Sequence, residues 1–201
     1  MDLNIKYSKE FSIEFINKLR STVGDIAKRQ GYWATSHVLT NAIDTYHHLN
    51  PGINCIEGHA DGRTPWLADE FPHIVRDALS RYDLYLTGGR FNLVLETEFS
   101  LKKENRADDF KKICSVSSHE KPVVRVFLGR TANYKKLRKD NHGIDPVEAS
   151  MSSDLPITII ECYWREGVSH LYSSAIFSAR VYHRGSIVHE VESGLELKQT
   201  A

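Results

Sequence analysis

The apolar positions of the first eighty residues recur three and four residues apart, which is the spacing of amphipathic helices. They predict one helix from Ser8, as its N-cap, to about Arg29. A second helix is expected from about Ser36 to Leu49, because Asn50-Pro51-Gly52 is a turn signal. A third is expected from Trp66 to Arg81. The first two helices are interpreted as packing elements.

Beyond residue 82 the pattern changes to the alternation and short apolar runs of strands. Asp83 to Leu86 and Arg90 to Ser100 predict a hairpin, because Gly88-Gly89 between them supplies the positive φ angles of a two-residue turn. The remaining expected elements are a helix from about Asn105 to Val116, buried strands at 122–128 and 156–162, and a last hairpin at about 172–192 that turns at 183–186.

This order of elements predicts an α/β fold with a central mixed β-sheet flanked by helices. A chain of 201 residues is long enough for one such domain and too short for two. No stretch approaches the roughly 18 consecutive apolar residues of a membrane span. The three cysteines are widely spaced, and residues 1–6 carry no secretory signal, so a reducing cytoplasm is expected.

The formal net charge is zero, but the charges are unevenly distributed. Residues 101–140 hold twelve basic and five acidic side chains, whereas residues 41–80 hold two basic and six acidic ones. This distribution is compatible with a basic face for a phosphate backbone and an acidic pocket elsewhere. The alternative is that solvated helix faces segregate by sign without any function.

The strand predicted around residues 91–99 carries the candidate chemistry. Side chains two apart share a face of a strand, so Val94, Glu96 and Glu98 point one way and Leu93 and Leu95 the other. The first half is apolar on both faces. The strand is therefore expected to turn acidic where it leaves the core, which is where ligand sites collect in open α/β sheets.

The predicted two-residue turn would pair Tyr85 with Asn92 and Asp83 with Val94. Asp83 would then lie diagonally beside Glu96, roughly 7–8 Å away between backbones. Carboxylates gathered in this way repel one another unless a cation neutralises them. Oxygen ligands of this kind suit Mg²⁺. A magnesium site on Asp83 and Glu96 is therefore expected.

An acidic residue on one strand, followed on the next by Glu96-Thr97-Glu98, resembles the core of the PD-(D/E)xK nucleases. It is most similar to the type II restriction endonucleases in which a Glu-x-Glu pair replaces the usual lysine. The resemblance covers about residues 66–163 and implies a restriction-endonuclease-like fold. It further implies Mg²⁺-dependent hydrolysis of double-stranded DNA at a specific sequence by a homodimer.

Carried over to this chain, the resemblance implies that Asp83 and Glu96 bind the metal, assisted by the main-chain carbonyl of Thr97. Glu98 would occupy the lysine position and help to position or deprotonate the attacking water. Glu70, on the third helix, would be a further acidic residue of the site. The basic side chains expected to contact DNA phosphates are Lys102, Lys103, Lys135, Lys136, Arg138 and Lys139.

Other interpretations of these residues stay open. Glu96 and Glu98 could form an exposed acidic strand face, Asp83 could be a turn residue, and Glu70 could favour the helix dipole at a helix start. Lys102 and Lys103 could merely solvate the next helix. The ten histidines lack the spacing of a zinc site. Alternative functions are a nuclease-like module that binds DNA without cutting it or regulates a partner, and a structure-specific or RNA-directed nuclease.

Overall fold

In the described part of the chain, eight strands form one mixed sheet in the order β2-β1-β3-β4-β5-β6-β7-β8. The computed structural model describes residues 2–27, 32–53, 57–61, 74–77, 81–98, 103–117, 120–131, 145–164 and 175–193. The strands are β1 Glu57–Asp61, β2 Ile74–Asp77, β3 Leu84–Thr87, β4 Asn92–Glu98, β5 Val123–Thr131, β6 Ile157–Trp164, β7 Ala175–His183 and β8 Ser186–Ser193. The predicted α/β fold, with a mixed sheet flanked by helices, is confirmed.

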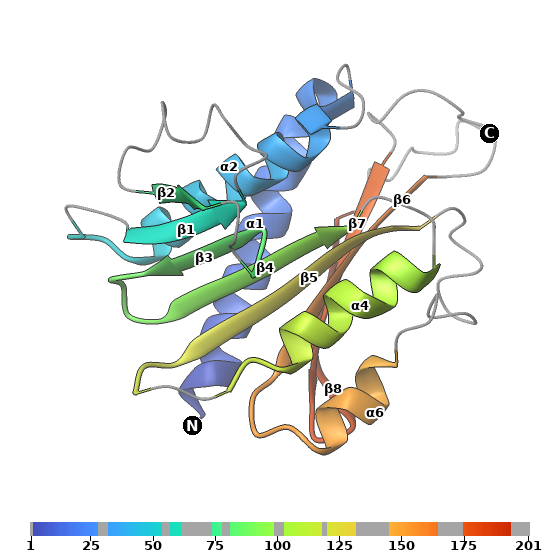
Figure 1. Ribbon diagram of the computed structural model, residues 1–201. Coiled ribbons are helices and arrows are strands. Elements are labelled where there is room, and N and C mark those ends of the chain that lie inside the picture. Colours follow the sequence, from blue (N-terminus) through green and yellow to red (C-terminus); the bar gives the residue numbers. More distant parts are fainter. Residues whose placement is uncertain are drawn as a thin grey trace.

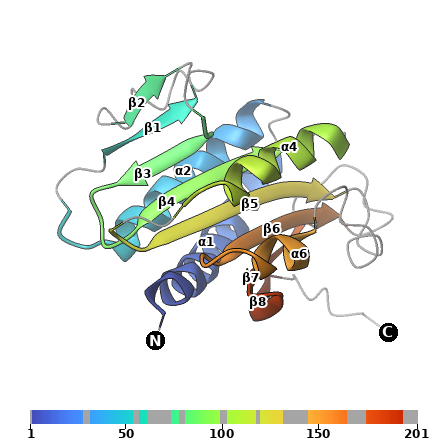
Figure 2. The ribbon, with the colours of Figure 1, turned by 60° about the horizontal axis from the view of Figure 1, so that its bottom comes forward.

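Helices cover both faces of this sheet. Helices α1 (Leu3–Ala27) and α2 (Tyr32–Leu49) lie on one face, and α4 (Lys103–Cys114) and α6 (Pro146–Met151) lie on the other (Figures 1 and 2). The two expected N-terminal helices and the helix before β5 are thereby confirmed. The expected N-cap is wrong, because Ser8 is buried inside α1 while the carboxylate of Asp2 accepts a hydrogen bond from the amide of Asn4 at 2.8 Å.

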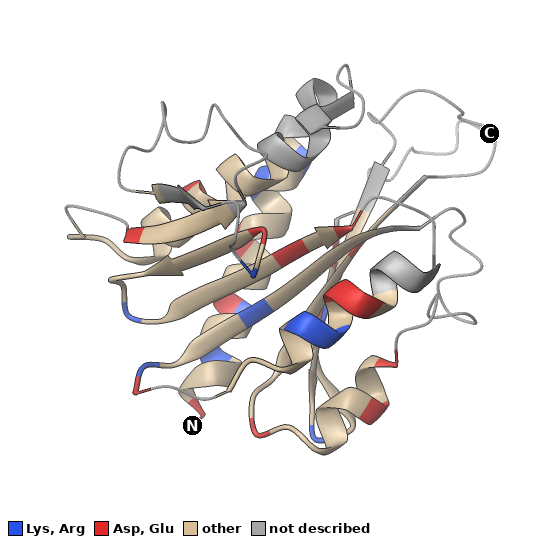
Figure 3. Ribbon diagram, viewed as in Figure 1, with Lys and Arg blue, Asp and Glu red and all other residues tan. Residues whose placement is uncertain are grey.

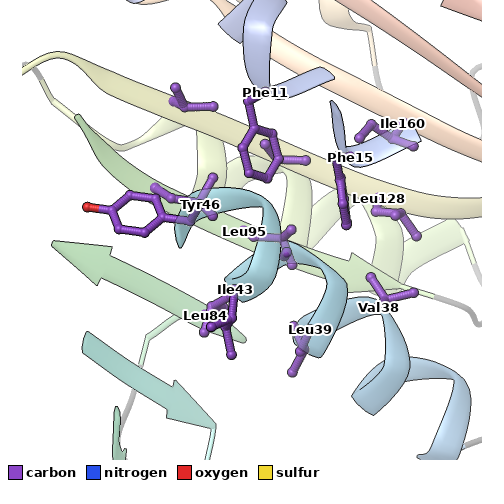
Figure 4. Packing of buried hydrophobic residues seen from close by; sticks show 14 of the residues in the cluster. Phe11, Phe15, Val38, Leu39, Ile43, Tyr46, Leu84, Leu95, Leu128 and Ile160 are labelled. Atoms are coloured by element: carbon purple, nitrogen blue, oxygen red, sulfur yellow. The ribbon is translucent and has the colours of Figure 1, made fainter. Parts of the chain in front are cut away.

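Each face of the sheet has its own hydrophobic core. On the α1 and α2 side, the apolar side chains of both helices pack on alternate residues of the central strands, among them Leu84, Leu95 and Leu128 (Figure 4). On the other side, Val94 and Phe127 pack against Phe110 of α4. The predicted alternation along β4 is therefore confirmed, and Glu96 belongs to the α4 face with Val94.

The third predicted helix is wrong where the structure describes it, at residues 74–77. These residues form β2, which pairs in parallel with β1, and Ile74 is buried. Ile74 and Val75 are adjacent β-branched residues, which favour strands, and β1 offers them an unpaired edge. At these residues, pairing with β1 is favoured over the helix that the apolar spacing predicted. The sequence pattern did not predict β1.

The β3–β4 hairpin has a different register from the predicted one. Tyr85 pairs with Val94 and Leu84 with Leu95, so four residues, 88–91, connect the strands instead of two. Side chains from the end of α2 hold this longer turn. The Tyr46 hydroxyl donates to the carbonyl of Phe91 and accepts from the amide of Gly89, both at 2.8 Å, and Asn50 Oδ1 accepts from the amide of Arg90 at 2.7 Å.

Gly89 lies tightly against this clamp, and we expect Gly89→Ala to destabilise the fold. An alanine Cβ there would meet Asn50 Oδ1 and the Tyr46 hydroxyl at 2.6 Å. The expected loss in the free energy of unfolding is about 2–3 kcal/mol, measured by urea titration. Gly52→Ala is the control, because no atom lies within 4 Å and only its φ of 89° opposes the change, costing about 1 kcal/mol. Equal losses in the two variants would contradict the clamp.

The predicted last hairpin is confirmed as β7 and β8. Arg184 and Gly185 connect the strands, with φ angles of 48° and 76°, as in the tight turns that join antiparallel strands. The predicted strands at 122–128 and 156–162 correspond to β5 and β6, which run parallel to β4. Among the described helices, none is long and apolar enough to cross a membrane.

Candidate functional site

Asp83 lies close enough to Glu96 for its negative charge to act on the Glu96 carboxyl group. Asp83 precedes β3, whose pairing with β4 ends at Leu84 and Leu95, and the same register extended by one residue would bring Asp83 opposite Glu96. The predicted diagonal arrangement is wrong by two residues, but a shift of two preserves the face. Glu96 lies in the second half of β4, 3.6 Å from Lys112 of helix α4. Figure 3 shows acidic positions on β4 and both acidic and basic positions on the neighbouring α4.

Thr97 positions the carboxylate of Asp83. Its amide and its hydroxyl both donate to Asp83 Oδ2 at 2.7 Å. Two hydrogen bonds to one oxygen fix the Asp83 carboxylate just before β3 begins. The described contacts of Thr97 are thus made by its amide and hydroxyl, and the role of its carbonyl as a metal ligand stays a prediction.

The carboxylate of Glu96 is buried, with a relative exposure of 1%. The expectation that β4 leaves the core at Glu96 is wrong, because the strand becomes partly exposed only from Thr97 onward. Helix α4 covers this position. Burial, and then the negative charge of Asp83, raise the pKa of Glu96 to about 9, although the charge of Lys112 opposes the shift.

One carboxyl oxygen of Glu96 accepts no hydrogen bond from the described residues. Within the part of the chain that the structure describes, Glu96 Oε1 is buried without a hydrogen-bond partner. The ammonium of Lys112 provides a counter-charge 3.6 Å from the same oxygen. A buried carboxylate oxygen without a donor costs free energy, which a cation at this position would recover.

Lys112 and Asp109 of α4 complete the charge arrangement, and the sequence analysis did not single out either residue. Lys112 Nζ donates to Asp109 Oδ1 at 2.6 Å. Burial works to lower the pKa of Lys112, but the hydrogen bond to Asp109 and the charges of Glu96, Asp109 and Asp83 raise it overall. The only signal in the sequence was the helical spacing that puts residues 109 and 112 on one face.

The other expected site residues stand as follows. Glu98 is partly exposed and, by strand alternation, lies on the same face as Glu96. The backbone of Lys103 begins α4, but its side chain is outside the described structure. The remaining expected residues lie outside the described residues: Glu70, Lys102, Lys135, Lys136, Arg138 and Lys139.

The site contains a pair of acidic side chains instead of a larger ligand group. Within the described ranges, no group of three or more histidine, cysteine, aspartate or glutamate side chains is placed to hold a metal ion. A pair still fits Mg²⁺, which takes one or two carboxylates and completes its shell with water and substrate phosphate oxygens. Asp83 and Glu96 are therefore the residues that could hold such an ion.

The charge of Glu96 predicts a specific dependence of stability on pH. Between its ordinary pKa of 4.5 and the folded value of about 9, the folded state holds a proton that the unfolded state has released. Stability is thus fully present below pH 4.5 and is lost as pH rises toward 9. Between pH 5 and pH 8 we expect the free energy of unfolding to fall by about 2–4 kcal/mol less in Glu96→Gln than in wild type, as measured by chemical denaturation. Glu120→Gln, at an exposed turn, is the control, and equal pH slopes in wild type and Glu96→Gln would contradict the prediction.

Comparisons with known proteins identify no relative of this chain. No protein-family model matches it, no curated protein matches it, and no solved structure matches it.

Proposed function

We propose that this protein is a Mg²⁺-dependent endonuclease of the type II restriction class, which hydrolyses double-stranded DNA at a specific sequence. The observation that carries the proposal is the buried carboxyl group of Glu96 near Asp83, whose Oε1 has no hydrogen-bond partner among the described residues and only an ion pair with Lys112. Two carboxylates in a low-dielectric setting repel each other, and a divalent cation removes the repulsion and supplies the missing partner. We further propose that it acts as a homodimer in the cytoplasm, since two-fold symmetric DNA sites are read by two-fold symmetric proteins.

The connection of the strands supports this proposal. Strand β3 lies antiparallel to both β1 and β4, and α4 then connects β4 to β5, which lies parallel to β4. The PD-(D/E)xK resemblance implies an acidic strand, a Glu-x-Glu strand, a helix and two further strands, and β3, β4, α4, β5 and β6 follow one another in this order. The helix that it implies before the acidic strand is instead β2 at the described residues 74–77. Asp83 directly precedes β3, and Glu96 and Glu98 end β4.

The chain's own residues have distinct tasks in this reaction. Asp83 and Glu96 would hold the ion, and Thr97 keeps Asp83 oriented through its two hydrogen bonds. A magnesium ion bound there would lower the pKa of its water and offset charge on the phosphate. Glu98, on the same face, would position the attacking water. Lys112 holds Glu96 in place and, being charged, can also contact a phosphate oxygen.

Cleavage of plasmid DNA tests the proposal directly. Purified protein with plasmid and Mg²⁺ is expected to produce discrete fragments, and EDTA is expected to leave the plasmid intact. A smear, cleavage confined to branched DNA, or cleavage of RNA would replace the sequence-specific assignment by a structure-specific or RNA-directed nuclease. An intact plasmid under all divalent ions would contradict the nuclease assignment.

A second candidate function is a nuclease-like module that binds DNA without cutting it, or regulates a partner. The observation that favours it is the 1% exposure of Glu96, whose charge is already met by Lys112. In this case the Glu96–Lys112 pair would be a structural element. DNA binding by gel shift that is independent of Mg²⁺ and unchanged in Glu96→Gln, without any cleavage, would favour this candidate.

A further inference from the structure

Strand β8 forms one end of the sheet. Among the described residues it pairs with β7 alone, and the order of strands ends there. The main-chain amide and carbonyl groups on the outer side of an edge strand can pair with an added strand. The sequence of β8 contains no proline and no lysine, which commonly prevent such pairing. A further strand can therefore add at this edge.

Three large apolar side chains are exposed on the α6 side of this edge. Ile187 of β8 has a relative exposure of 50%, and Val147 and Met151 of α6 have exposures of 42% and 68%. Val147 and Met151 are four residues apart and therefore share one side of α6. Ile187 pairs with Tyr182, which belongs to the core on the α4 and α6 face, so Ile187 projects from that face. We call these three residues the α6–β8 surface.

Helix α6 is docked against the turn between β7 and β8. The hydroxyl of Ser150 accepts a hydrogen bond from the amide of Gly185 at 3.0 Å. A Cβ at Gly185 would lie 3.0 Å from Cγ of Met151, so the Met151 side chain lies against this turn. Figures 1 and 2 show α6 beside β7 and β8. The exposed apolar side chains of α6 are therefore held next to the sheet edge.

The charges of β8 favour an antiparallel copy of the same strand as the partner. Arg184 lies at the turn before β8, and Glu190 and Glu192 lie in its second half; all three are exposed. Glu190 keeps 47% of its side chain exposed although it is paired with Arg180. In an antiparallel pair, Arg184 of each chain approaches the acidic half of the other, and Ile187 lies close to the centre. A parallel pair would bring like charges together.

We propose that this protein forms a homodimer through antiparallel association of two β8 edges, with the α6–β8 surfaces of the two copies packed together. The inference specifies the interface of the homodimer in the proposed function, and it rests on that part of the proposal. The two-fold axis of such a dimer is perpendicular to the sheet. The Asp83–Glu96 sites of both copies would therefore face the same side of the assembly.

The apolar side chains are expected to contribute most of the binding free energy. The register between β7 and β8 shifts opposite Val181 and Tyr182, so Val188 has no opposite residue on β7. A bulge of this kind bends the strand and limits regular main-chain pairing with a copy. The association therefore depends on burying exposed apolar side chains at the centre of the interface.

Sedimentation velocity of the full-length protein over a range of concentrations tests this interface. Wild type is expected to form dimers as the concentration rises. Ile187→Lys and Met151→Lys should each raise the dissociation constant at least about tenfold, because each places a charge in the apolar contact. Leu3→Lys is the matched control, since Leu3 is 49% exposed but begins α1 on the other face of the sheet, and it should dimerise like wild type. Thermal unfolding verifies that each variant is folded.

Reversing one charge provides an independent measurement. Arg184→Glu should weaken the dimer, because it places a third acidic side chain beside the acidic half of the other copy. Arg184→Lys keeps the charge and should dimerise like wild type. The difference between these two variants should decrease as the salt concentration rises.

The outcomes separate this interface from the rest of the proposed function. A wild type that stays monomeric at every concentration would overturn both the interface and the proposed homodimer. A dimer that is affected equally by Ile187→Lys, Met151→Lys and Leu3→Lys would overturn this interface and leave the homodimer in place. Cleavage of DNA is measured separately, so a dimer with this interface that cuts no DNA would overturn only the nuclease assignment.

Discussion

Arg125→Met is expected to lower the free energy of unfolding by at least about 4 kcal/mol. The guanidinium of Arg125 is fully buried in the sheet, at the position of β5 next to Val94. It donates to the main-chain carbonyls of Cys114, the last residue of α4, and of Val116 just beyond the helix. It also donates to the carbonyls of Leu155 and Pro156 before β6 and to the hydroxyl of Ser153. Methionine would fill the volume but leave these buried carbonyls without donors, and each costs about 1–3 kcal/mol.

Two other variants make this prediction specific. Arg125→Lys keeps the charge but replaces five donors in a fork by three on one nitrogen, so most of the loss should remain. Lys111→Met removes an exposed charge whose partner is Asp108, one turn away, and should change stability by less than about 0.5 kcal/mol. Urea titration measures all three. A loss in Arg125→Met as small as in Lys111→Met would show that the carbonyls find other partners.

The interactions of Arg125 also bear on the candidate site. Burial lowers the pKa of Arg125 to about 10, so the guanidinium is still charged at neutral pH. Its bonds to the carbonyls of Cys114 and Val116 anchor the end of α4 to the sheet. Lys112, two residues before Cys114, is thereby held near Glu96. The geometry of the acidic site thus depends on a residue on the neighbouring strand.

The alternation along β4 could be predicted from the sequence because it is a local property. A strand with apolar residues on both faces and acids at its end specifies which side chains share a face, and this placed Asp83 and Glu96 on one side. The register could not be predicted in the same way. The register depends on Tyr46 and Asn50, which are more than thirty-five residues away in sequence. Their side chains form hydrogen bonds with the main chain of the four-residue turn at 88–91.

The burial of Glu96 and the role of Arg125 were not predictable from local patterns either. Glu96 is buried because α4 packs over β4, and the position of Lys112 depends on where that helix ends. The run around Arg125 predicted a buried strand, but a charged residue within such a run has no partner in its own segment. Its partners come from two segments that converge only in the folded chain.

The wrong prediction of a helix at 66–81 has a similar cause, because the strand observed at residues 74–77 depends on a partner elsewhere in the sequence. The apolar spacing there fits a helix, yet residues 74–77 pair with β1, a short strand containing Gly58 and His59. The sequence of β1 is not strongly apolar, so its local pattern does not predict a strand. The pairing of β2 with β1 could therefore not be predicted either. Strand pairing is a non-local interaction, and it can outweigh helix propensity over a short segment.

Asp83→Asn is expected to reduce Mg²⁺-dependent DNA cleavage by at least about 100-fold, because it removes one of two charged metal ligands while keeping the size of the side chain. Asparagine still has an oxygen that can accept from the amide and hydroxyl of Thr97, so the fold should be retained. The measurement is the rate of plasmid cleavage at saturating Mg²⁺. Asp108→Asn, exposed on α4, is the control and should cleave at the wild-type rate.

The same substitution has a second expected effect that does not depend on activity. The charge of Asp83 helps to raise the pKa of Glu96, so its removal should lower that pKa below about 9. The pH range over which stability is lost should then narrow from its upper end, as measured by denaturation from pH 5 to 9. A variant that changes this pH profile and still cleaves DNA at the wild-type rate would show that the Asp83–Glu96 pair exists but is not the catalytic site. The two readouts together therefore separate the geometry of the acidic pair from its proposed chemistry.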